Sequence, residues 1–411
     1  MTTTELVQPR SGTRAILGRG TLSRPASFWF IGALYALFLM ASTAPSPMYS
    51  IYQQRWHFTT TVLTEVFAVY AVVILLALVL FGSLSDHIGR RPVLLTGLVL
   101  EIASMLVLAV APGVGWLLVG RALQGLGTGI ATSAISGALL DFQRPGTNRG
   151  SLINGVAAGL GMALGSLLAG VLVQFVPGPT LTSYLLLILG FVLAIPGVLL
   201  MPEPVARRST LREVLRPQRP TVPAGKGVTF ALMATTLLAS WIVGGMFMSL
   251  GPSVAKGLVS GNPYLVGGLA VAALAGFGGL AQLALSGWAA RRAVRVGAPL
   301  MIVGLAGVAA AALGQGAVVF FVSSAVLGTG WGLVFMGGFR MLTGLAAPEH
   351  RAGTAALIYV VAYLSASVPS VALGFLSTAF GLTAATLIFT ATAALFVTVA
   401  ALSTFAGPRE S

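Results

Sequence analysis

The chain has 411 residues, of which 56% are hydrophobic and only 8% are charged. A soluble domain carries about a quarter charged residues, so this composition excludes a soluble globular protein and indicates a polytopic membrane protein in a lipid bilayer. The formal net charge of +14 would suit nucleic acid, but the arginines are spread over short loops without one basic face, so no nucleic-acid partner is expected. The absence of cysteine excludes disulfides, thiol catalysis and thiolate metal sites.

Residues 1–27 form a polar segment with several arginines ahead of the first apolar run. That run reads on through a proline pair to Tyr49, and no small-residue cleavage site is evident. We therefore expect a cytoplasmic N-terminal tail and a retained first helix instead of a signal peptide.

Long apolar runs continue along the rest of the chain, and a spanning helix needs about 20 such residues. Runs of this kind lie near 28–49, 62–84, 93–112, 114–140, 150–176, 182–201, 228–251, 264–288, 298–315, 317–342, 352–378 and 382–405. The predicted fold class is an all-α membrane protein with twelve transmembrane helices in two six-helix bundles, at 28–201 and 228–405. A cytoplasmic tail is expected at 406–411.

The connections between these runs alternate in charge. Arg55 and Lys256 lie on one side, whereas the other side holds the N-terminal tail, Arg90, Arg91, Arg144, Arg149, the 202–227 segment, Arg291, Arg292, Arg295, Arg340, Arg351 and Arg409. The positive-inside rule places the arginine-rich side, and with it both termini, in the cytoplasm. Two lysines against many arginines and 52 glycines indicate a bacterial genome, hence a bacterial cytoplasmic (inner) membrane.

The 202–227 segment is rich in proline and arginine and cannot span a membrane, so it is expected to be a cytoplasmic linker between the two bundles. A short amphipathic surface helix near 209–216 and a plain linker are both consistent with its composition.

The two halves echo one another. Leu-Gly-Thr-Gly occurs at 126–129 and again at 327–330, and the 287–295 stretch follows the eighth run as 82–90 follows the second. These echoes indicate a duplicated six-helix unit and pseudo-symmetric bundles. Because Arg291 replaces the aspartate of the first copy, a charged latch is expected mainly in the first half.

The first copy, Gly-Ser-Leu-Ser-Asp-His-Ile-Gly-Arg-Arg-Pro-Val at 82–93, is a charged turn between two apolar runs. Ionised groups are costly in hydrocarbon, so Asp86, Arg90 and Arg91 must lie at the water edge. Gly82 allows close helix packing, and Gly89 can supply a positive φ in a tight turn. Asp86 and Arg90 are four apart and share a face if the loop is partly helical.

This spacing resembles the loop between the second and third helices of the major facilitator superfamily, Gly-x-Leu-x-Asp-x-x-Gly-Arg-Arg/Lys. Its positions are filled by Gly82, Leu84, Asp86, Gly89, Arg90 and Arg91. A basic loop that touches anionic lipid heads would not need the two glycines and the aspartate. The resemblance implies a charge relay in which Arg90 pairs with Asp141 while Asp86 faces the start of the eleventh helix near 352–353. Such contacts are expected to form only when the halves close on the cytoplasmic side.

The fourth run, Val-Gly-Arg-Ala-Leu-Gln-Gly-Leu-Gly-Thr-Gly-Ile, places Arg121 about 9 Å inside the outer boundary if the helix begins near Gly115. An arginine at that depth needs a carboxylate, a carbonyl or water, so it is expected to face the bundle interior, although it could snorkel outward. The stretch is similar to the superfamily's Arg-x-x-x-Gly-x-Gly pattern, which implies a role of the arginine in proton coupling.

Two carboxylates within apolar runs are further candidates for carrying a proton. Glu101 falls about 12 Å beyond Val93, near the midplane of a ~30 Å core, and burial there favours a neutral carboxyl. Glu65 lies near the outer interface, where a solvated residue at a helix end explains it equally well.

The fifth run carries Gly161, Gly165 and Gly170, a small-residue stripe suited to close helix contact. It is similar to the Gly-x-x-x-Gly-Pro-x-x-Gly-Gly pattern of drug/proton antiporters. However, Ser166 stands in place of the proline and Ala169 in place of a glycine, and plain packing explains the stripe nearly as well.

Sparse polar or adaptable side chains in otherwise apolar helices are candidates for lining a substrate cavity, since methionine and aromatic groups rearrange around varied ligands. They are Tyr35, Gln124, Asn154, Trp241, Met246, Gln282, Trp331, Tyr359 and Tyr363.

The sequence contains no metal-spaced histidine pair and no phosphate-binding Gly-x-x-x-x-Gly-Lys-Ser/Thr loop, so we expect neither an enzyme nor a cofactor. The predicted function is secondary transport by alternating access, with proton-coupled efflux of amphiphilic small molecules or drugs by a monomer. A sugar-efflux or facilitative carrier of the same fold, and a non-transporting membrane receptor or scaffold, are the alternatives.

Overall fold

The computed structural model describes residues 21–205, 220–222, 225–259, 263–345 and 351–406. The possible surface helix near 209–216, most of the N-terminal tail and residues 407–411 lie outside these ranges. Within them the chain forms helices joined by short connections, and no strand occurs.

Residues 21–205, the described part of the first half, form eight helices. These are α1 (Arg24–Thr43), α2 (Pro45–Trp56), α3 (Thr60–Phe81), α4 (Leu84–Ile88), α5 (Arg90–Ala109), α6 (Val114–Phe142), α7 (Arg149–Phe175) and α8 (Pro179–Leu200). The second half forms α10 (Gly227–Ser249), α11 (Gly251–Gly257), α12 (Pro263–Ala284), α13 (Ala290–Ala310), the short π-helix η1 (Ala311–Gln315), α14 (Ala317–Gly344), α15 (Arg351–Phe380) and α16 (Leu382–Ala406).

Eleven stretches of the described chain are long and apolar enough to cross a membrane, and α1 with α2 counts as one of them. α6 is the twelfth long helix, although it is less apolar than the others. Its glycines, threonines, Arg121 and Gln124 are largely buried against neighbouring helices, so the bundle takes the place of lipid around it. The predicted all-α fold with twelve membrane helices is confirmed.

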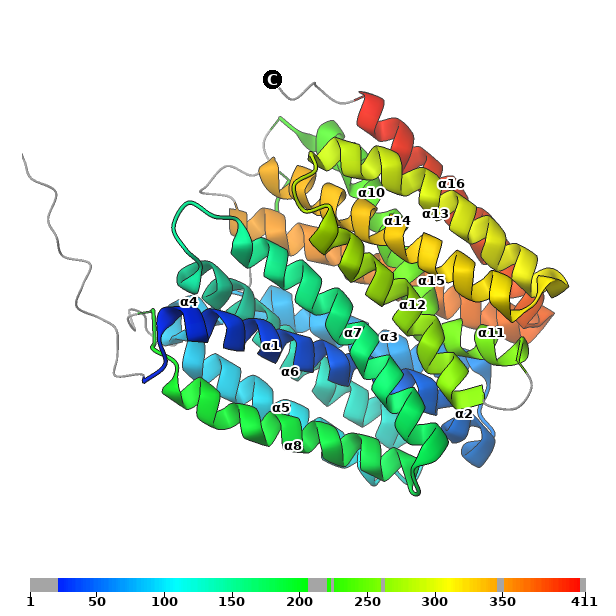
Figure 1. Ribbon diagram of the computed structural model, residues 1–411, viewed down its shortest axis with the longest axis horizontal. Helices are drawn as coiled ribbons and strands as arrows, with labels where there is room; N and C mark the ends of the chain where they lie inside the picture. Colours follow the sequence, from blue (N-terminus) through cyan, green and yellow to red (C-terminus); the bar gives the residue numbers. More distant parts are fainter. Residues whose placement is uncertain (1–20, 206–219, 223–224, 260–262, 346–350, 407–411) are drawn as a thin grey trace, which may run out of the picture.

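The two halves lie side by side and meet along two helix pairs, α7 with α12 and α3 with α15 (Figure 1). The first seam is close because Gly159 of α7 lies against Gly279 of α12, where an added Cβ would fall 2.9 Å from the Gly279 Cα. Small residues at both positions allow the two backbones to approach.

The molecule has two distinct ends. One end, which we call the arginine-rich end, holds α4 and lies at the left of Figure 1; the opposite end holds the end of α2 and α11. Arg90, which begins α5 directly after α4, and its partner Asp141 belong to the arginine-rich end. Side chains of the two halves bond to each other at or near the opposite end. Thr61 and Thr378 share a 2.9 Å hydrogen bond between their hydroxyls, and Tyr264 donates to Gln54 at 3.3 Å. These bonds join the two halves at the opposite end.

Several helices begin earlier than the apolar runs indicate, and in α5 and α13 the additional turn is charged. α5 starts at Arg90 and α13 at Ala290, so the charged residues before both runs are themselves helical. In α13 the guanidinium groups of Arg291 and Arg295 donate to the Thr404 carbonyl near the end of α16. Such tertiary bonds hold a first turn that hydrophobicity alone does not predict.

Candidate functional site

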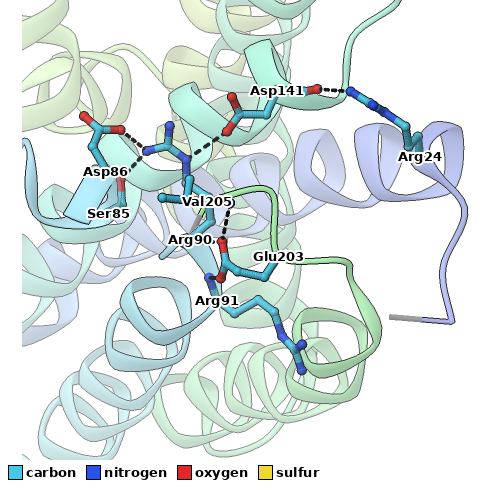
Figure 2. A network of polar contacts seen from close by, with 8 residues as sticks. All are labelled: Arg24, Ser85, Asp86, Arg90, Arg91, Asp141, Glu203 and Val205. Carbon is cyan, nitrogen blue, oxygen red and sulfur yellow. Dashed lines mark hydrogen bonds and ion pairs between the residues drawn. The ribbon is translucent and has the colours of Figure 1, made fainter. Parts of the chain in front are cut away.

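Arg90 is the centre of a polar cluster at the arginine-rich end (Figure 2). Its guanidinium donates to Asp86 at 2.5 Å, to Ser85 at 2.5 Å and to Asp141 at 3.0 Å, and the residue is only 7% exposed. The guanidinium lies against Gly137 of α6, where any side chain would occupy its space. A glycine at this position is therefore what allows Arg90 to reach Asp141.

The local geometry of this turn confirms two predictions. Gly89 has φ +102°, so it supplies the positive φ, and α4 is helical, so Asp86 and Arg90 share a face. The expected pairing of Arg90 with Asp141 is also present.

The expected cross-bundle part of the relay differs from the structure. Asp86 pairs with Arg90 of its own half, its side chain is 57% exposed, and α4 packs on α5 and α6 of the same half. No described contact joins Asp86 to the start of α15. Both bonds of Arg90 lie within the first half, so the expectation that they form only on closure against the second half is wrong.

Glu203, which sequence reasoning missed, completes the cluster. Its carboxylate accepts the backbone N–H groups of Arg90 at 2.9 Å and Arg91 at 2.8 Å (Figure 2). The residue before α5 is Gly89, which has no side chain to satisfy the free N–H groups of the first turn, and a carboxylate also complements the helix dipole there. A carboxylate directly after the sixth apolar run was the available signal.

Two more arginines tie this cluster to its surroundings. Arg24 donates to the Asp141 carbonyl at 2.7 Å, and the Arg91 guanidinium donates to the Leu199 carbonyl at the end of α8. The cluster therefore joins α1, α4, α5, α6 and α8 of the first half.

A second polar cluster is buried inside the first half around Arg121. This residue is 1% exposed, so the interior orientation is confirmed and outward snorkelling is excluded. Its guanidinium donates to the Ser42 carbonyl at 3.0 Å and to the Gln124 side chain, and it lies 3.9 Å from the Tyr70 ring centroid. The charge is thus stabilised by neutral acceptors and a π-face.

Glu101 lies beside this cluster and is fully buried between α5 and α6. One carboxyl oxygen accepts a 2.6 Å hydrogen bond from Thr128, the other has no hydrogen-bond partner among the described residues, and the carboxyl is within electrostatic reach of Arg121. The third predicted proton-coupling residue, Glu65, is exposed on α3 and does not join them.

A central cavity of about 220 Å³ lies between the halves. It extends from Ser46, which bonds to the second half at the Met248 carbonyl, to Ser151 and Arg340 toward the arginine-rich end. Tyr70 and Ser42 form part of its wall, and they are the groups that contact Arg121. The buried cluster therefore lies directly behind the cavity wall.

Seven of the nine predicted cavity residues line this cavity: Tyr35, Asn154, Trp241, Gln282, Trp331, Tyr359 and Tyr363. Gln124 does not, because its side chain bonds to Arg121 and to the Ala41 carbonyl. Met246 does not either. The cavity face of α10 is the stripe Trp241, Gly244, Gly245 and Met248, and Met246 lies off it in the apolar core.

The second half contributes cavity residues that sequence reasoning did not select. Phe335, Phe339 and Arg340 of α14 line the cavity, and the Arg340 guanidinium donates to the carbonyls of Ser286 at 3.0 Å and Trp288 at 3.1 Å. Arg340 was assigned to topology alone, although its position one residue after an aromatic ladder on a long helix was a usable signal.

The glycine stripe of α7 serves two different contacts. Gly161 and Gly165 lie against the α1 backbone at Ala36 and Met40, whereas Gly170 faces the α12 backbone near Gly268. The stripe therefore holds α1 within the first half and meets the second half at its far end.

In the described part of the chain, twelve long helices form two halves with a largely apolar cavity between them, and this is the architecture of membrane transporters. The family model described as Major Facilitator Superfamily matches residues 31–363, so the chain belongs to this transporter superfamily and is not an enzyme.

Relatives and solved structures agree with this family. The chain is 29% identical over 199 residues to Citrate exporter 1 of Aspergillus niger, covering 47% of this chain and 37% of that one. It is 26% identical over 117 residues to the inner membrane transport protein YajR of Escherichia coli, covering 28% and 25%. The chain thus matches well under half of the length of these relatives.

Solved structures are similar over nearly the whole fold. A POT family transporter in complex with 5-aminolevulinic acid aligns with TM-score 0.74 at 13% identity, covering 94% of this chain and 98% of that one. The human organic anion transporter MFSD10 aligns with TM-score 0.68 at 15% identity, covering 92% and 100%. At identities this low, the structural similarity establishes the fold alone.

Proposed function

We propose that this transporter exports amphiphilic small molecules in exchange for protons, by alternating access of the central cavity. The observation that carries the proposal is the burial of two ionisable residues, Arg121 and Glu101, in one region behind the cavity wall. Ionisable groups inside a membrane bundle are costly and typically mark ion or proton pathways. Here the cluster touches the cavity through Tyr70 and Ser42, so a change in its charge reaches the binding site.

A proton on Glu101 would change how the Arg121 charge is balanced. With Glu101 ionised, the carboxylate offsets the nearby guanidinium; with Glu101 neutral, Arg121 depends on Ser42, Gln124 and the Tyr70 ring. An uncompensated buried charge is strongly unfavourable, so the two states favour different arrangements around Tyr70. Substrate at the wall and proton at Glu101 would then compete through this shared contact.

In this proposal the arginine-rich end faces the cytoplasm of a bacterial cell, as the positive-inside rule predicts. The structure, whose two halves are joined by hydrogen bonds at the opposite end, then corresponds to the inward-facing state. Export is also the activity that the name of one relative, Citrate exporter 1, describes.

The test uses purified protein reconstituted into liposomes that contain a fluorescent amphiphile. A proton gradient is imposed across the liposome membrane in either direction. An imposed inward proton gradient should accelerate export, and collapse of the gradient with an ionophore should remove the acceleration. Export that ignores the gradient would contradict the coupling and support a facilitative carrier of the same fold.

The residue assignment is tested by Arg121→Ala and Glu101→Gln in the same liposomes. Both variants should lose gradient-driven export by about a hundredfold while retaining the helical fold, since each removes one of the two buried ionisable groups. Glu65→Gln is the matched control, because this carboxyl is exposed and lies outside the cluster. Wild-type coupling in Arg121→Ala would remove Arg121 from the mechanism.

A further inference from the structure

One wall of the cavity is an aromatic ladder on α14. Trp331, Phe335 and Phe339 are spaced four apart and therefore share one helix face. Their rings are near parallel, with centroids 6.3 Å apart at 18° for Trp331 and Phe335 and 5.9 Å apart at 27° for Phe335 and Phe339. All three line the cavity.

Rings from α10 and α15 extend this ladder. The ring centroid of Trp241 lies 6.4 Å from that of Phe335 and 4.7 Å from that of Tyr363, with which it makes an edge contact. The ring centroids of Tyr359 and Tyr363 are 6.4 Å apart. All these rings come from the second half, so they form one aromatic wall that suits a flat apolar ligand.

The charge of the cavity has a single sign. Among the described residues that line it, Arg340 carries a charge and no aspartate or glutamate occurs. Two of the five N–H donors of its guanidinium are used by the Ser286 and Trp288 carbonyls, which hold the group in place and leave three donors. A bound cation would lose water without gaining a counter-charge, whereas a carboxylate would gain charge-assisted hydrogen bonds.

A second donor is available within the aromatic wall. The Nε1 of Trp241 is buried and has no hydrogen-bond partner among the described residues, and an indole can only donate. By contrast, the Trp331 Nε1 is satisfied by the Ser240 carbonyl at 2.8 Å. Trp241 therefore offers a bond to an acceptor atom of the ligand.

We propose that the cavity selects flat aromatic compounds that carry one carboxylate or similar anionic group. The aromatic body lies against the wall of Trp331, Phe335 and Trp241, and the anionic group binds Arg340. This substrate class deepens the proposed export function. It rests on that function only because both assume that the central cavity is the substrate-binding site.

The test is isothermal titration calorimetry of the purified full-length protein in detergent, without any proton gradient. Three probes share one naphthalene body: the carboxylate 2-naphthaleneacetate, the alcohol 2-(2-naphthyl)ethanol and the amine 2-(2-naphthyl)ethylamine. The anion should bind about tenfold or more tightly than the alcohol, because of its charge-assisted bonds, and the amine should bind most weakly.

Arg340→Gln should weaken binding of the anion by about tenfold and leave the alcohol nearly unchanged, because it removes the charge and keeps a polar side chain. Retained binding of the alcohol shows that this variant is folded. Arg144→Gln is the matched control, since it removes one arginine charge from an exposed loop position outside the cavity lining.

Three outcomes would overturn the inference: tighter binding of the amine than of the anion, an unchanged preference in Arg340→Gln, or no binding of any probe at millimolar concentration. These outcomes are separable from failure of proton coupling. Gradient-driven export of the amine would leave the proposed function intact and refute the substrate class, whereas binding of the anion without gradient-driven export would do the reverse.

Discussion

The two halves of the molecule make two corresponding links at the arginine-rich end, of which one has the same chemistry in both halves and the other does not. In both halves an arginine in the first turns of the third long helix donates to a carbonyl near the end of the sixth. Arg91 of α5 reaches the Leu199 carbonyl of α8, and Arg295 of α13 reaches the Thr404 carbonyl of α16 at 3.3 Å. This link is preserved between the halves, and neutral acceptors serve it in both.

The link to the fourth long helix is reversed between the halves. In the first half the arginine is Arg90, which begins α5 directly after the loop, and the acceptor is the Asp141 carboxylate of α6. In the second half the arginine is on the helix, at Arg340 of α14, and the acceptors are the Ser286 and Trp288 carbonyls of the loop. A loop can thus be fixed from either side. Among the described residues, the ion pairs of this end, Arg90 with Asp86 and with Asp141, belong to the first half.

The two links to the fourth long helix differ in how many guanidinium N–H donors they leave for other partners. Arg90 is enclosed by two carboxylates and is 7% exposed, so its donors are committed to structure. Arg340 gives two donors to carbonyls and also lines the cavity. The first half therefore holds an ionic cluster outside the cavity, whereas the second half places the Arg340 guanidinium in the cavity lining.

The strongest test of this contrast is Arg90→Ala. Removing the shared partner of Asp86 and Asp141 should lower the free energy of unfolding by about 2–4 kcal/mol, because breaking a buried ion pair leaves uncompensated charge. Partial exposure of both carboxylates keeps the effect from being larger. Unfolding of the purified protein in increasing SDS, followed by circular dichroism, measures it.

The matched control is Arg91→Ala, in which a single bond to the neutral Leu199 carbonyl is lost. Its expected cost is about 1 kcal/mol or less. Equal losses in the two variants would show that ionic pairing adds nothing to the first half, and the contrast between the halves would be only geometric.

A smaller effect is expected from Gly137→Ala. The Arg90 guanidinium occupies the space that a Cβ would need, so the added methyl group must push Arg90 away from Asp141. Overpacking of this kind costs about 1–3 kcal/mol. The same SDS titration measures this cost, and the rate of gradient-driven export shows whether the displaced latch affects transport.

Gly115→Ala is the control on the same helix, since nothing lies near its missing side chain. It should be neutral or stabilise α6 by up to about 1 kcal/mol through helix propensity. If both alanine variants behaved alike, the close fit of Arg90 against Gly137 would carry no energetic weight.

Sequence reasoning succeeded where a local pattern carries the information. The fold follows from the lengths of the apolar runs, the turn geometry from Gly89, and the pair of Asp86 and Arg90 from their spacing of four. The cavity lining was partly predictable, because a polar or aromatic side chain in an apolar helix needs an interior position.

The errors arise where the rotation of a helix, or a contact with a residue far away in the sequence, determines whether a side chain lines the cavity. Met246 is one residue past Gly245 in the stripe of Trp241, Gly244, Gly245 and Met248, and a single residue turns a side chain by about 100° around a helix. Gln124 faces inward as expected, but Arg121 takes up its carbonyl oxygen. Neither fact is visible in the sequence without the neighbouring helices.

Glu203 shows the same limit and gives the smallest predicted effect. It lies 113 residues from Arg90 along the chain, so only the return of α8 beside the start of α5 reveals that its carboxylate caps that helix. Glu203→Ala should cost about 1 kcal/mol, typical of a lost N-cap, because two N–H groups lose their acceptor. Glu203→Gln should cost less, since the amide oxygen still accepts one bond.

Hydrogen exchange of the Arg90 and Arg91 amides is the direct measurement. Both amides should exchange faster in Glu203→Ala, with Glu203→Gln intermediate, while amides near the start of α13, whose first turns have no such carboxylate in the structure's described part, should be unchanged. Equal acceleration at both helix starts would mean that Glu203 stabilises the whole molecule. The cap would then not be what distinguishes the first half from the second.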